Sequence, residues 1–255
     1  IDQMKDEIIN DTQKLISFKS IENKKDKYPF GKEVHKSLEF CLNLCKSYNF
    51  KTKNIDNKVG YAEIGSGKDL VGILVHLDVV PEGNEKDWEY PPFKGIIKND
   101  KLYGRGAIDD KGPAISAIYA MKAILDNNID LNKRFRIIFG LNEETNWESI
   151  DYYLKNEEIP KMAFTPDADF PVIKGEKGIL NFNLNKEFEE FVDDNGVEIL
   201  KISGGNRKNM VPDYAEVILK ENNKKIKHIL DAFNKKHNIN IKYNKKNTKT
   251  ILKLK

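Results

Sequence analysis

Two nearly uninterrupted apolar runs constrain the fold of this chain most. They read LVGILV at residues 70–75 and FRIIF at residues 135–139. A strand that is covered on both faces loses the alternation of apolar and polar residues, so these runs predict two buried strands. Helical patterns occur nearby at 112–127 and 147–155. Strands that alternate with helices predict an α/β domain with a mostly parallel sheet and flanking helices.

The pattern changes after about residue 174. Smaller strand-like and helical segments follow, at 179–184, 198–202, 214–220, 224–236 (helical), 239–243 and 250–255. Such a mixture predicts an α+β unit, so we expect a boundary near 174–177 and two domains, at residues 1–175 and 176–255. The last predicted strand has no turn after it, which leads us to expect that the chain is the N-terminal part of a longer protein.

Charge and cysteine content narrow the classes of partner. The chain has 43 basic and 40 acidic residues, so its net charge is only +3, and we expect neither nucleic acid nor a membrane surface as a partner. No apolar run approaches the ~20 residues that span a bilayer. Cys41 and Cys45 are the only cysteines and are four residues apart on a predicted helix. We interpret them as core thiols of a cytoplasmic protein.

Acidic segments stand where the apolar runs stop. His76-Leu77-Asp78 follows the first run, Glu143-Glu144 follows the second, and a third segment, PDAD at 166–169, follows a short run at 162–164. Ligands of open α/β sheets bind beyond the carboxyl ends of the strands, so we expect these side chains to converge. Nitrogen and oxygen ligands without a thiolate suit a pair of zinc ions, with manganese or cobalt as alternatives.

His76 and Asp78 are two residues apart at a strand end. Side chains two apart on a strand share a face. Because a metal-bound histidine usually donates its other N–H to a carboxylate, we predict His76 as a ligand and Asp78 as its partner. The alternative is a strand-end histidine whose nitrogens are satisfied by a neighbouring turn.

Asp109 and Asp110 precede a predicted helix. One of them could simply cap the helix, but capping does not explain two in a row. A carboxylate can also bridge two cations with one oxygen each, and Asp109 is our candidate bridge.

Glu143 and Glu144 are adjacent, so their side chains point in different directions. One can bind metal while the other moves a proton to or from a metal-activated water. The alternative is an acidic, solvated surface loop.

Taken together, six segments resemble the dinuclear zinc aminoacylase and dipeptidase superfamily. They are HLDVVPEG at 76–83, GRGAIDDKGP at 104–113, NEET at 142–145, PDADFP at 166–171, GEKG at 175–178 and NMVPD at 209–213. The order is kept through essentially the whole chain. The chain most resembles the Xaa-His dipeptidase branch, which includes carnosinase and the PepV-type enzymes.

This resemblance implies a zinc exopeptidase catalytic domain in residues 1–175, followed by part of a lid domain in 176–255. It implies two divalent metal ions, one held by His76, Asp109 and Asp167, and the other by Asp109 and Glu144. It also implies a cis peptide bond between Asp109 and Asp110.

The resemblance further assigns the catalytic and substrate-binding roles. Glu143 matches the general base, Asp78 the carboxylate that orients His76, and Asn209 a substrate-binding position in the lid. A lid histidine and a last metal-binding histidine of the superfamily have no match in this sequence. We therefore expect residues 1–255 alone to be inactive and to bind metal poorly.

The implied activity is hydrolysis of dipeptides by a water held between two zinc ions, with a small peptide as the substrate. One alternative is an N-acyl amino acid deacylase or desuccinylase of the same superfamily, which would use the same site residues. Another is a non-catalytic module that retains the fold, because fold alone does not fix function.

Overall fold

A computed structural model describes most of the chain. The described residues are 2–169, 171–178, 180, 182, 184–185, 197–205, 211–212, 214–221, 226–246 and 249–254. The contacts between residues divide the chain into two compact units, Ile1–Glu176 and Lys177–Lys255. Their assignment as catalytic and lid domains stays a prediction.

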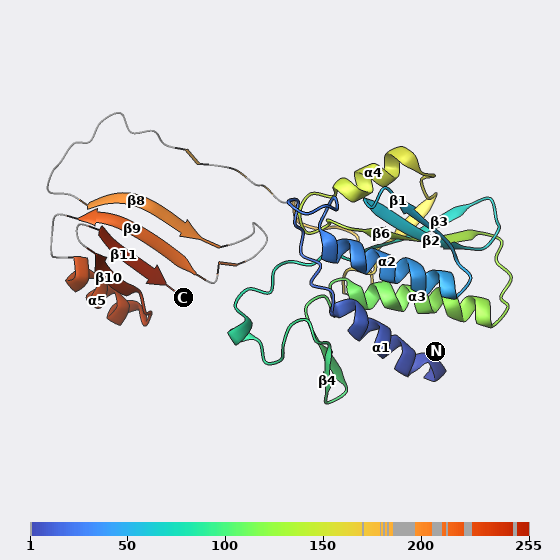
Figure 1. The fold of residues 1–255 in the computed structure, drawn as a ribbon, viewed down its shortest axis with the longest axis horizontal. Helices are drawn as coiled ribbons and strands as arrows, with labels where there is room; N and C mark the ends of the chain where they lie inside the picture. Colours follow the sequence, from blue (N-terminus) through green and yellow to red (C-terminus); the bar gives the residue numbers. More distant parts are fainter. Residues whose placement is uncertain are drawn as a thin grey trace. The chain divides into compact units, whose positions relative to one another are not determined.

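The first unit is built on a mixed five-stranded sheet (Figure 1). Its strands, in spatial order, are β1 (Lys51–Ile55), β2 (Val59–Ile64), β6 (Arg134–Gly140), β3 (Leu70–His76) and β7 (Met162–Phe164). β3 pairs in parallel with β6 and β7, whereas β2 is antiparallel to both of its neighbours, β1 and β6. Only β2 therefore runs against the other four strands, which confirms the predicted α/β fold with a mostly parallel sheet.

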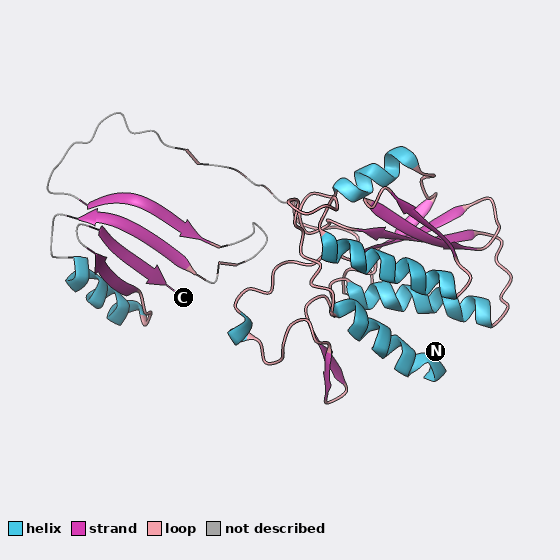
Figure 2. Cartoon of the chain, in the orientation of Figure 1, coloured by secondary structure: helices cyan, strands magenta, loops and turns pink. Residues whose placement is uncertain are grey.

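Helices cover both faces of this sheet (Figure 2). Three lie on one face, namely α1 (Lys5–Ile16), α2 (Lys32–Ser47) and α3 (Lys111–Asp126), and α4 (Glu148–Asn156) lies on the other. On β6, Ile137 belongs to the large core cluster formed with α1–α3, and Ile138 belongs to a smaller cluster with Tyr153 of α4. Successive residues of a strand face opposite sides, so an apolar run is what two covered faces require.

The helix α2 shows how the sequence pattern becomes packing. Val34, Leu38, Cys41, Leu42 and Cys45 are all buried. Their spacing of three or four residues places them on one face of the helix, which faces the core. Both cysteines are free thiols inside this core, as predicted.

In the second unit the described residues form an antiparallel sheet and one helix. The strands, in spatial order, are β10 (Lys242–Lys246), β11 (Lys249–Leu254), β9 (Ala215–Glu221) and β8 (Val197–Gly204), and the helix is α5 (Ile226–His237). Leu219 of β9 and Leu230 of α5 are buried, so this unit has apolar residues of its own inside. This is the α+β pattern that the sequence indicates.

Some elements differ from the sequence-based expectation. The strand expected at 239–243 begins later, at Lys242. In the range 179–184, residues 180, 182 and 184 are not in a strand, and residues 179, 181 and 183 lie outside the described part. Elements that the sequence did not indicate are β1, the hairpin of β4 (Ile96–Lys98) and β5 (Lys101–Tyr103), and the short 3₁₀ helices η1 (Asp2–Met4) and η2 (Glu85–Asp87).

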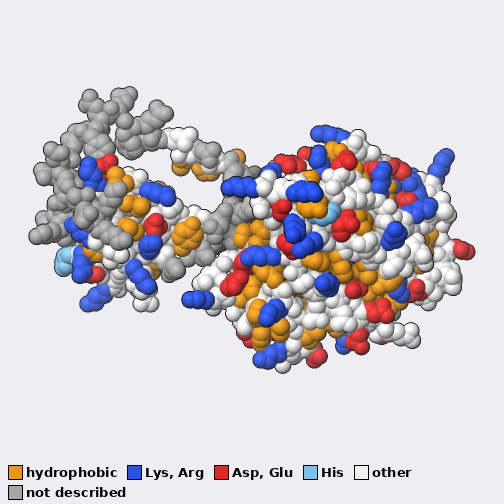
Figure 3. All heavy atoms as spheres, viewed as in Figure 1, with side chains coloured by type: hydrophobic (Ala, Val, Ile, Leu, Met, Phe, Trp, Pro, Cys, Tyr) orange, Lys and Arg blue, Asp and Glu red, His pale blue; other side chains and the backbone are white. Residues whose placement is uncertain are grey.

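Charged side chains of both signs are interspersed over the face of the first unit that Figure 3 shows. This fits the near-balance of 43 basic and 40 acidic residues. Within the described residues, none of the helices is both long enough and apolar enough to cross a bilayer.

Candidate metal centre

The acidic segments meet at one edge of the first sheet. β3 ends at His76, and Glu143 and Asp167 follow shortly after the ends of β6 and β7. β6, β3 and β7 are neighbouring parallel strands, so their carboxyl ends lie side by side. Asp109 reaches the same edge from the turn that precedes α3. The predicted convergence of these segments is therefore observed.

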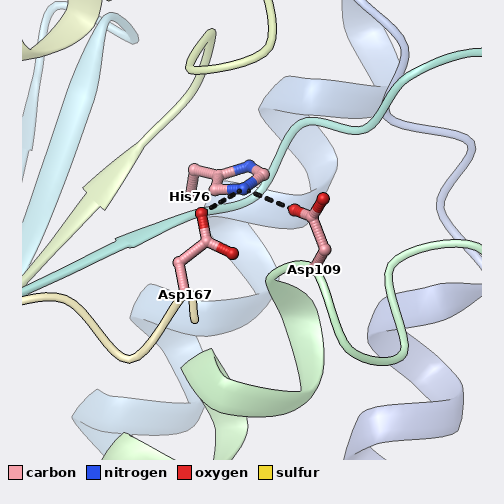
Figure 4. A group of neighbouring side chains, drawn as sticks. All are labelled: His76, Asp109 and Asp167. Carbon is pink, nitrogen blue, oxygen red and sulfur yellow. Dashed lines mark hydrogen bonds and ion pairs between the residues drawn. The ribbon is translucent and has the colours of Figure 1, made fainter. Parts of the chain in front are cut away.

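His76, Asp109 and Asp167 form a compact group of metal-ligand type (Figure 4). His76 Nε2 lies 2.9 Å from Asp109 Oδ1 and 3.4 Å from Asp167 Oδ2. One ligand atom from each of the three residues lies within 4.8 Å of the others. The side chain of His76 is 4% exposed and that of Asp109 is 60% exposed. The group is therefore buried on the His76 side and open to solvent on the Asp109 side.

The His76 imidazole is held from behind by the backbone. Its Nδ1 lies 3.0 Å from the carbonyl oxygen of Asp78 and 3.4 Å from the Asp78 carboxylate. The nearer partner is thus the carbonyl, whereas the sequence led us to expect the carboxylate. The backbone N–H of His76 donates to Asp110 Oδ2 at 2.9 Å. The contact at Nδ1 leaves Nε2 facing Asp109 and Asp167.

The Asp78 carboxylate has a second task that the sequence did not indicate. Its two oxygens accept hydrogen bonds from the backbone N–H groups of Glu143 (3.1 Å) and Glu144 (3.2 Å). The same turn is closed by Asn142, whose side-chain oxygen accepts from the backbone N–H of Ser149 at 2.9 Å. Asp78 therefore connects the end of β3 to the turn that carries both glutamates.

The electrostatics of the site favour a cation. Burial lowers the pKa of His76, but hydrogen bonds with three aspartates outweigh burial and hold this pKa well above its usual value. The hydrogen bond with His76 lowers the pKa of Asp109. Burial raises the pKa of Glu143, and burial together with the charge of Asp109 raises the pKa of Glu144 to about 7. Crowded carboxylates repel one another, and a bound cation would relieve that repulsion.

The turn before α3 is anchored by a lysine. The Asp109–Asp110 peptide bond is cis, as the superfamily resemblance implies. The next residue, Lys111, is fully buried, and its Nζ donates to the carbonyl oxygens of Leu15 (3.1 Å) and Phe18 (2.7 Å) at the end of α1. These bonds tie the end of α1 and the residues just after it to the start of α3. Burial lowers the pKa of Lys111 to about 7.

Asp110 is a buried site residue that the sequence left without a role. Its side chain is fully buried, and its Oδ1 has no hydrogen-bond partner in the described part of the chain. Burial raises the pKa of this carboxyl to about 7. The DDKGP segment was the available signal, but the sequence cannot tell which of two adjacent aspartates turns inwards.

The other predicted site residues differ in how far the structure places them. Glu143 Oε2 lies 4.0 Å from His76 Nε2, at the margin of the group. Glu144 is not a member of the three-residue group, although the shared turn brings it beside Glu143. Asn209, predicted to bind substrate, lies outside the described residues. The metal-binding and catalytic roles of all these residues stay predictions.

Sequence comparison identifies the family. The model of "Peptidase family M20/M25/M40" matches residues 72–244, which is more than half of the chain. The chain belongs to this peptidase family. The result confirms the resemblance to the aminoacylase and dipeptidase superfamily. The family is one of metallopeptidases, so it implies divalent metal ions, in agreement with the group at His76.

Curated relatives carry dipeptidase names. YtjP of Bacillus subtilis (strain 168), provisionally named a dipeptidase, is 40% identical over 232 residues, which is 90% of this chain and 49% of YtjP. A Staphylococcus aureus (strain N315) protein with the same provisional name is 40% identical over 228 residues, covering 87% of this chain and 48% of that protein. The chain thus spans about half the length of the curated relatives it matches.

Solved structures share the fold. Human carnosine dipeptidase 1 matches with a TM-score of 0.54 and 22% identity, over 64% of this chain and 39% of that chain. The M20 metallo-carboxypeptidase Sso-CP2 of Sulfolobus solfataricus matches with a TM-score of 0.52 and 27% identity, over 63% and 37% of the two chains. The dipeptidase Dug1p of Saccharomyces cerevisiae matches with a TM-score of 0.52 and 23% identity, over 60% of this chain and 36% of that chain.

Proposed function

We propose that this chain belongs to a metal-dependent dipeptidase that hydrolyses small peptides. The observation that carries the proposal is the group of His76, Asp109 and Asp167, whose ligand atoms converge within 4.8 Å. The group lies at the carboxyl edge of the sheet, where ligands of α/β folds bind. The dipeptidase names of the sequence relatives support the same conclusion. In this proposal the first unit is the catalytic domain and the second is the start of a lid.

The residues present fit two divalent ions of zinc type, with manganese or cobalt as alternatives. One imidazole nitrogen and several carboxylate oxygens are the donor set that these ions accept. His76, Asp109 and Asp167 would hold one ion, and Asp109 and Glu144 would hold the other. When bound, the ions would polarise the scissile carbonyl and lower the pKa of the attacking water.

Glu143 is the proposed general base. Its carboxylate lies 4.0 Å from His76 Nε2, which is close enough to reach a water at the centre. Burial raises its pKa, and a base whose pKa approaches the working pH is the more effective one. In the proposed reaction Glu143 takes a proton from the attacking water and returns it to the leaving amine. Asp78 serves this step by holding the Glu143 turn through its backbone N–H groups.

The test uses the protein in its natural full length. After treatment with a chelator, zinc, manganese or cobalt is added back, and a panel of dipeptides is assayed beside N-acetyl and N-succinyl amino acids. We expect dipeptide hydrolysis that the chelator abolishes and the metal restores. Turnover of the N-acyl amino acids alone would favour the deacylase alternative. Activity untouched by the chelator would contradict the metal-dependent mechanism.

A further inference from the structure

A cavity of about 310 Å³ opens directly beside the candidate metal centre. Asp109 belongs to its wall, so the cavity and the metal-ligand group share a residue. Its other main lining residues are Trp88, Tyr90, Leu102, Tyr103, Arg105 and Ile108. We call this cavity the Trp88 pocket. Binding sites for small molecules measure roughly 300–1,000 Å³, so the Trp88 pocket has room for one amino-acid side chain.

Arg105 is the one cationic side chain among the residues that line the Trp88 pocket. Its guanidinium lies 5.0 Å from the centroid of the Trp88 ring, within the range of a cation–π contact. Trp88 is itself fixed, because its Nε1–H donates to the carbonyl oxygen of Glu82 at 2.8 Å. The backbone N–H of Arg105 also donates to the carbonyl oxygen of Pro92 at 2.7 Å. The backbone of Arg105 and the Trp88 ring are therefore fixed, and the guanidinium lies against that ring.

The hydrogen-bonding capacity of this guanidinium is largely unused. Within the described residues, Nε of Arg105 is buried without a partner, and Nη2 makes only a long contact of 3.4 Å to the Pro81 carbonyl oxygen. A buried donor without a partner is costly, and a guanidinium offers five N–H groups in a planar fork. That fork matches a carboxylate, which accepts two parallel hydrogen bonds from it.

Glu82 and Asp109 interact with the charge of Arg105 at longer range, but their direct partners are other residues. Glu82 forms an ion pair with Lys19, and Asp109 pairs with His76. Glu89 lies in the pocket wall and is hydrogen-bonded to Tyr90, whose pKa it raises. No ion pair of Arg105 occurs among the residues that the structure describes. The missing carboxylate is thus one that a ligand could supply.

We propose that the Trp88 pocket receives the acidic side chain of a substrate residue, with Arg105 binding its carboxylate. The inference rests on the proposed dipeptidase function and specifies it, since dipeptides that contain aspartate or glutamate become the preferred class. The aromatic residues of the pocket wall favour binding of a glutamate or aspartate side chain, because they would cover its methylene groups. The sharing of Asp109 places such a side chain next to the reacting carbonyl.

The test compares acidic substrates with neutral ones of the same shape. With the metal-loaded natural full-length enzyme, kcat/KM is measured for Ala-Glu and Glu-Ala against Ala-Gln and Gln-Ala. We expect a preference for glutamate in at least one order, of about 10- to 100-fold, as charge-assisted hydrogen bonds provide. Arg105→Met should reduce that ratio to near one. Arg105→Lys, which keeps the charge without the fork, should give an intermediate ratio.

Matched controls separate charge from folding. Lys51→Met removes one positive charge from exposed β1, two strands away from the site strands, and should leave the Glu/Gln ratio unchanged. Circular dichroism and metal content identify a variant that has lost its fold, and Arg105→Lys then decides the question. Binding of Ala-Glu, followed by calorimetry in the metal-free wild type and Arg105→Met, gives a readout that does not depend on turnover.

The outcomes distinguish the two proposals. If the wild type hydrolyses no dipeptide, the proposed function fails, and calorimetry still tests the pocket. If dipeptides are hydrolysed and the Glu/Gln ratio is the same in wild type, Arg105→Met and Arg105→Lys, the inference is overturned and the function stands. An equal loss of kcat/KM for Ala-Ala and Ala-Glu would mean that Arg105 binds the terminal carboxylate, which also overturns the side-chain assignment.

Discussion

Asp78 connects the two halves of the candidate site. Its backbone carbonyl lies against the His76 imidazole, and its carboxylate accepts the backbone N–H groups of Glu143 and Glu144. The side chain is almost completely buried, so water cannot replace these hydrogen bonds easily. This carboxylate thus adds a side-chain link to the backbone pairing that already holds the end of β3 beside β6.

We predict that Asp78→Asn weakens metal binding and lowers kcat by about 10- to 100-fold, as loss of an outer-sphere partner typically does. An amide has one acceptor oxygen, and its NH₂ group would face a backbone N–H that needs an acceptor. Metal affinity from competition with a chromophoric chelator measures the effect. Asp69→Asn, at a side chain that is 44% exposed, is the matched control. Equal metal affinity in Asp78→Asn and wild type would contradict this account.

Glu143 gives a second prediction at the scale of one residue. Glu143→Gln keeps the size of the side chain but cannot accept a proton, so we expect kcat to fall by about 10²–10⁴-fold while metal content is kept. Stopped assays with dipeptide and metal analysis of the same samples measure both quantities. Glu148→Gln changes an exposed glutamate of α4 in the same way and should retain activity. A Glu143→Gln enzyme with normal kcat would assign the base to another group.

At the scale of elements, a buried ionic cluster links the sheet to the side chains around α4. Arg136 of β6 donates from Nε and Nη2 to Glu63 Oε2 of β2, at 2.8 and 2.6 Å. Its Nη1 donates to the Tyr153 hydroxyl at 2.8 Å, and its guanidinium lies 4.0 Å from the centroid of the Tyr61 ring. Arg136 and Glu63 are both buried, and their other charged neighbours are more distant, with Arg134 at 3.8 Å from Glu63 and Glu157 at 4.0 Å from Arg136.

We predict that Arg136→Met lowers the free energy of unfolding of the first unit by about 3–5 kcal/mol, because buried Glu63 loses both contacts with Arg136 and keeps, among the described residues, only one of 3.8 Å with Arg134. The double variant Arg136→Met/Glu63→Leu should recover most of this loss, since it removes both charges. Urea unfolding of the wild type, Arg136→Met, Glu63→Leu and the double variant measures the coupling energy between Arg136 and Glu63. Single and double variants that are equally unstable would show that packing, and not the ion pair, sets the cost.

The same elements show what the sequence could and could not indicate. β3 and β6 were predictable because both faces are covered, and their apolar runs report that directly. β1 reads KTKNI and is mostly exposed at the sheet edge, so its pairing with β2 decides its structure and its sequence leaves no pattern. Arg136 interrupts an apolar run, and nothing in the sequence marks Glu63 as its partner. Pairing between residues far apart in the sequence depends on the tertiary fold, so local periodicity does not predict it.

The candidate site also has features that the sequence predicted and features that it did not. The strand ends indicated correctly that His76 and Asp167 are neighbours, because the position after a parallel strand fixes where a side chain lies, whereas the family resemblance added Asp109 to this group. The dual contact of Asp78 and the inward turn of Asp110 depend on the loop conformation between elements, which spacing does not determine. The Trp88 pocket was not predicted from the sequence for the same reason, because its walls come from a segment with little regular structure.

At the scale of the whole molecule, the first unit concentrates negative charge at one sheet edge, although the chain as a whole is nearly neutral. Without a cation the site holds its charge balance with protons. Burial lowers the pKa of His76, but hydrogen bonds with aspartates raise it well above its usual value, so we expect a protonated imidazole at neutral pH. Burial and the charge of Asp109 raise the pKa of Glu144 to about 7, so this carboxyl is partly protonated there.

Metal binding should therefore release protons and strengthen as pH rises. The ion held by His76 needs a neutral imidazole and the ion held by Glu144 needs an ionised carboxylate, so each of these changes expels a proton. The pKa values of His76 and Glu144 are both raised, so protons compete with the metal at and below pH 7. The affinity for metal should therefore increase as pH rises. We expect about one to two protons released in total when both ions bind near pH 7, and fewer above pH 7, where Glu144 is already ionised.

Calorimetric titration of the natural full-length protein with zinc, in buffers of different ionisation enthalpy between pH 6 and 8, measures this release. Glu144→Gln should abolish the part of the release that titrates near pH 7, and the exposed Glu148→Gln should leave it intact. The His76 proton should persist in both variants. Heats that do not depend on the buffer, or an affinity that falls as pH rises, would mean that the acidic edge does not exchange protons for a cation.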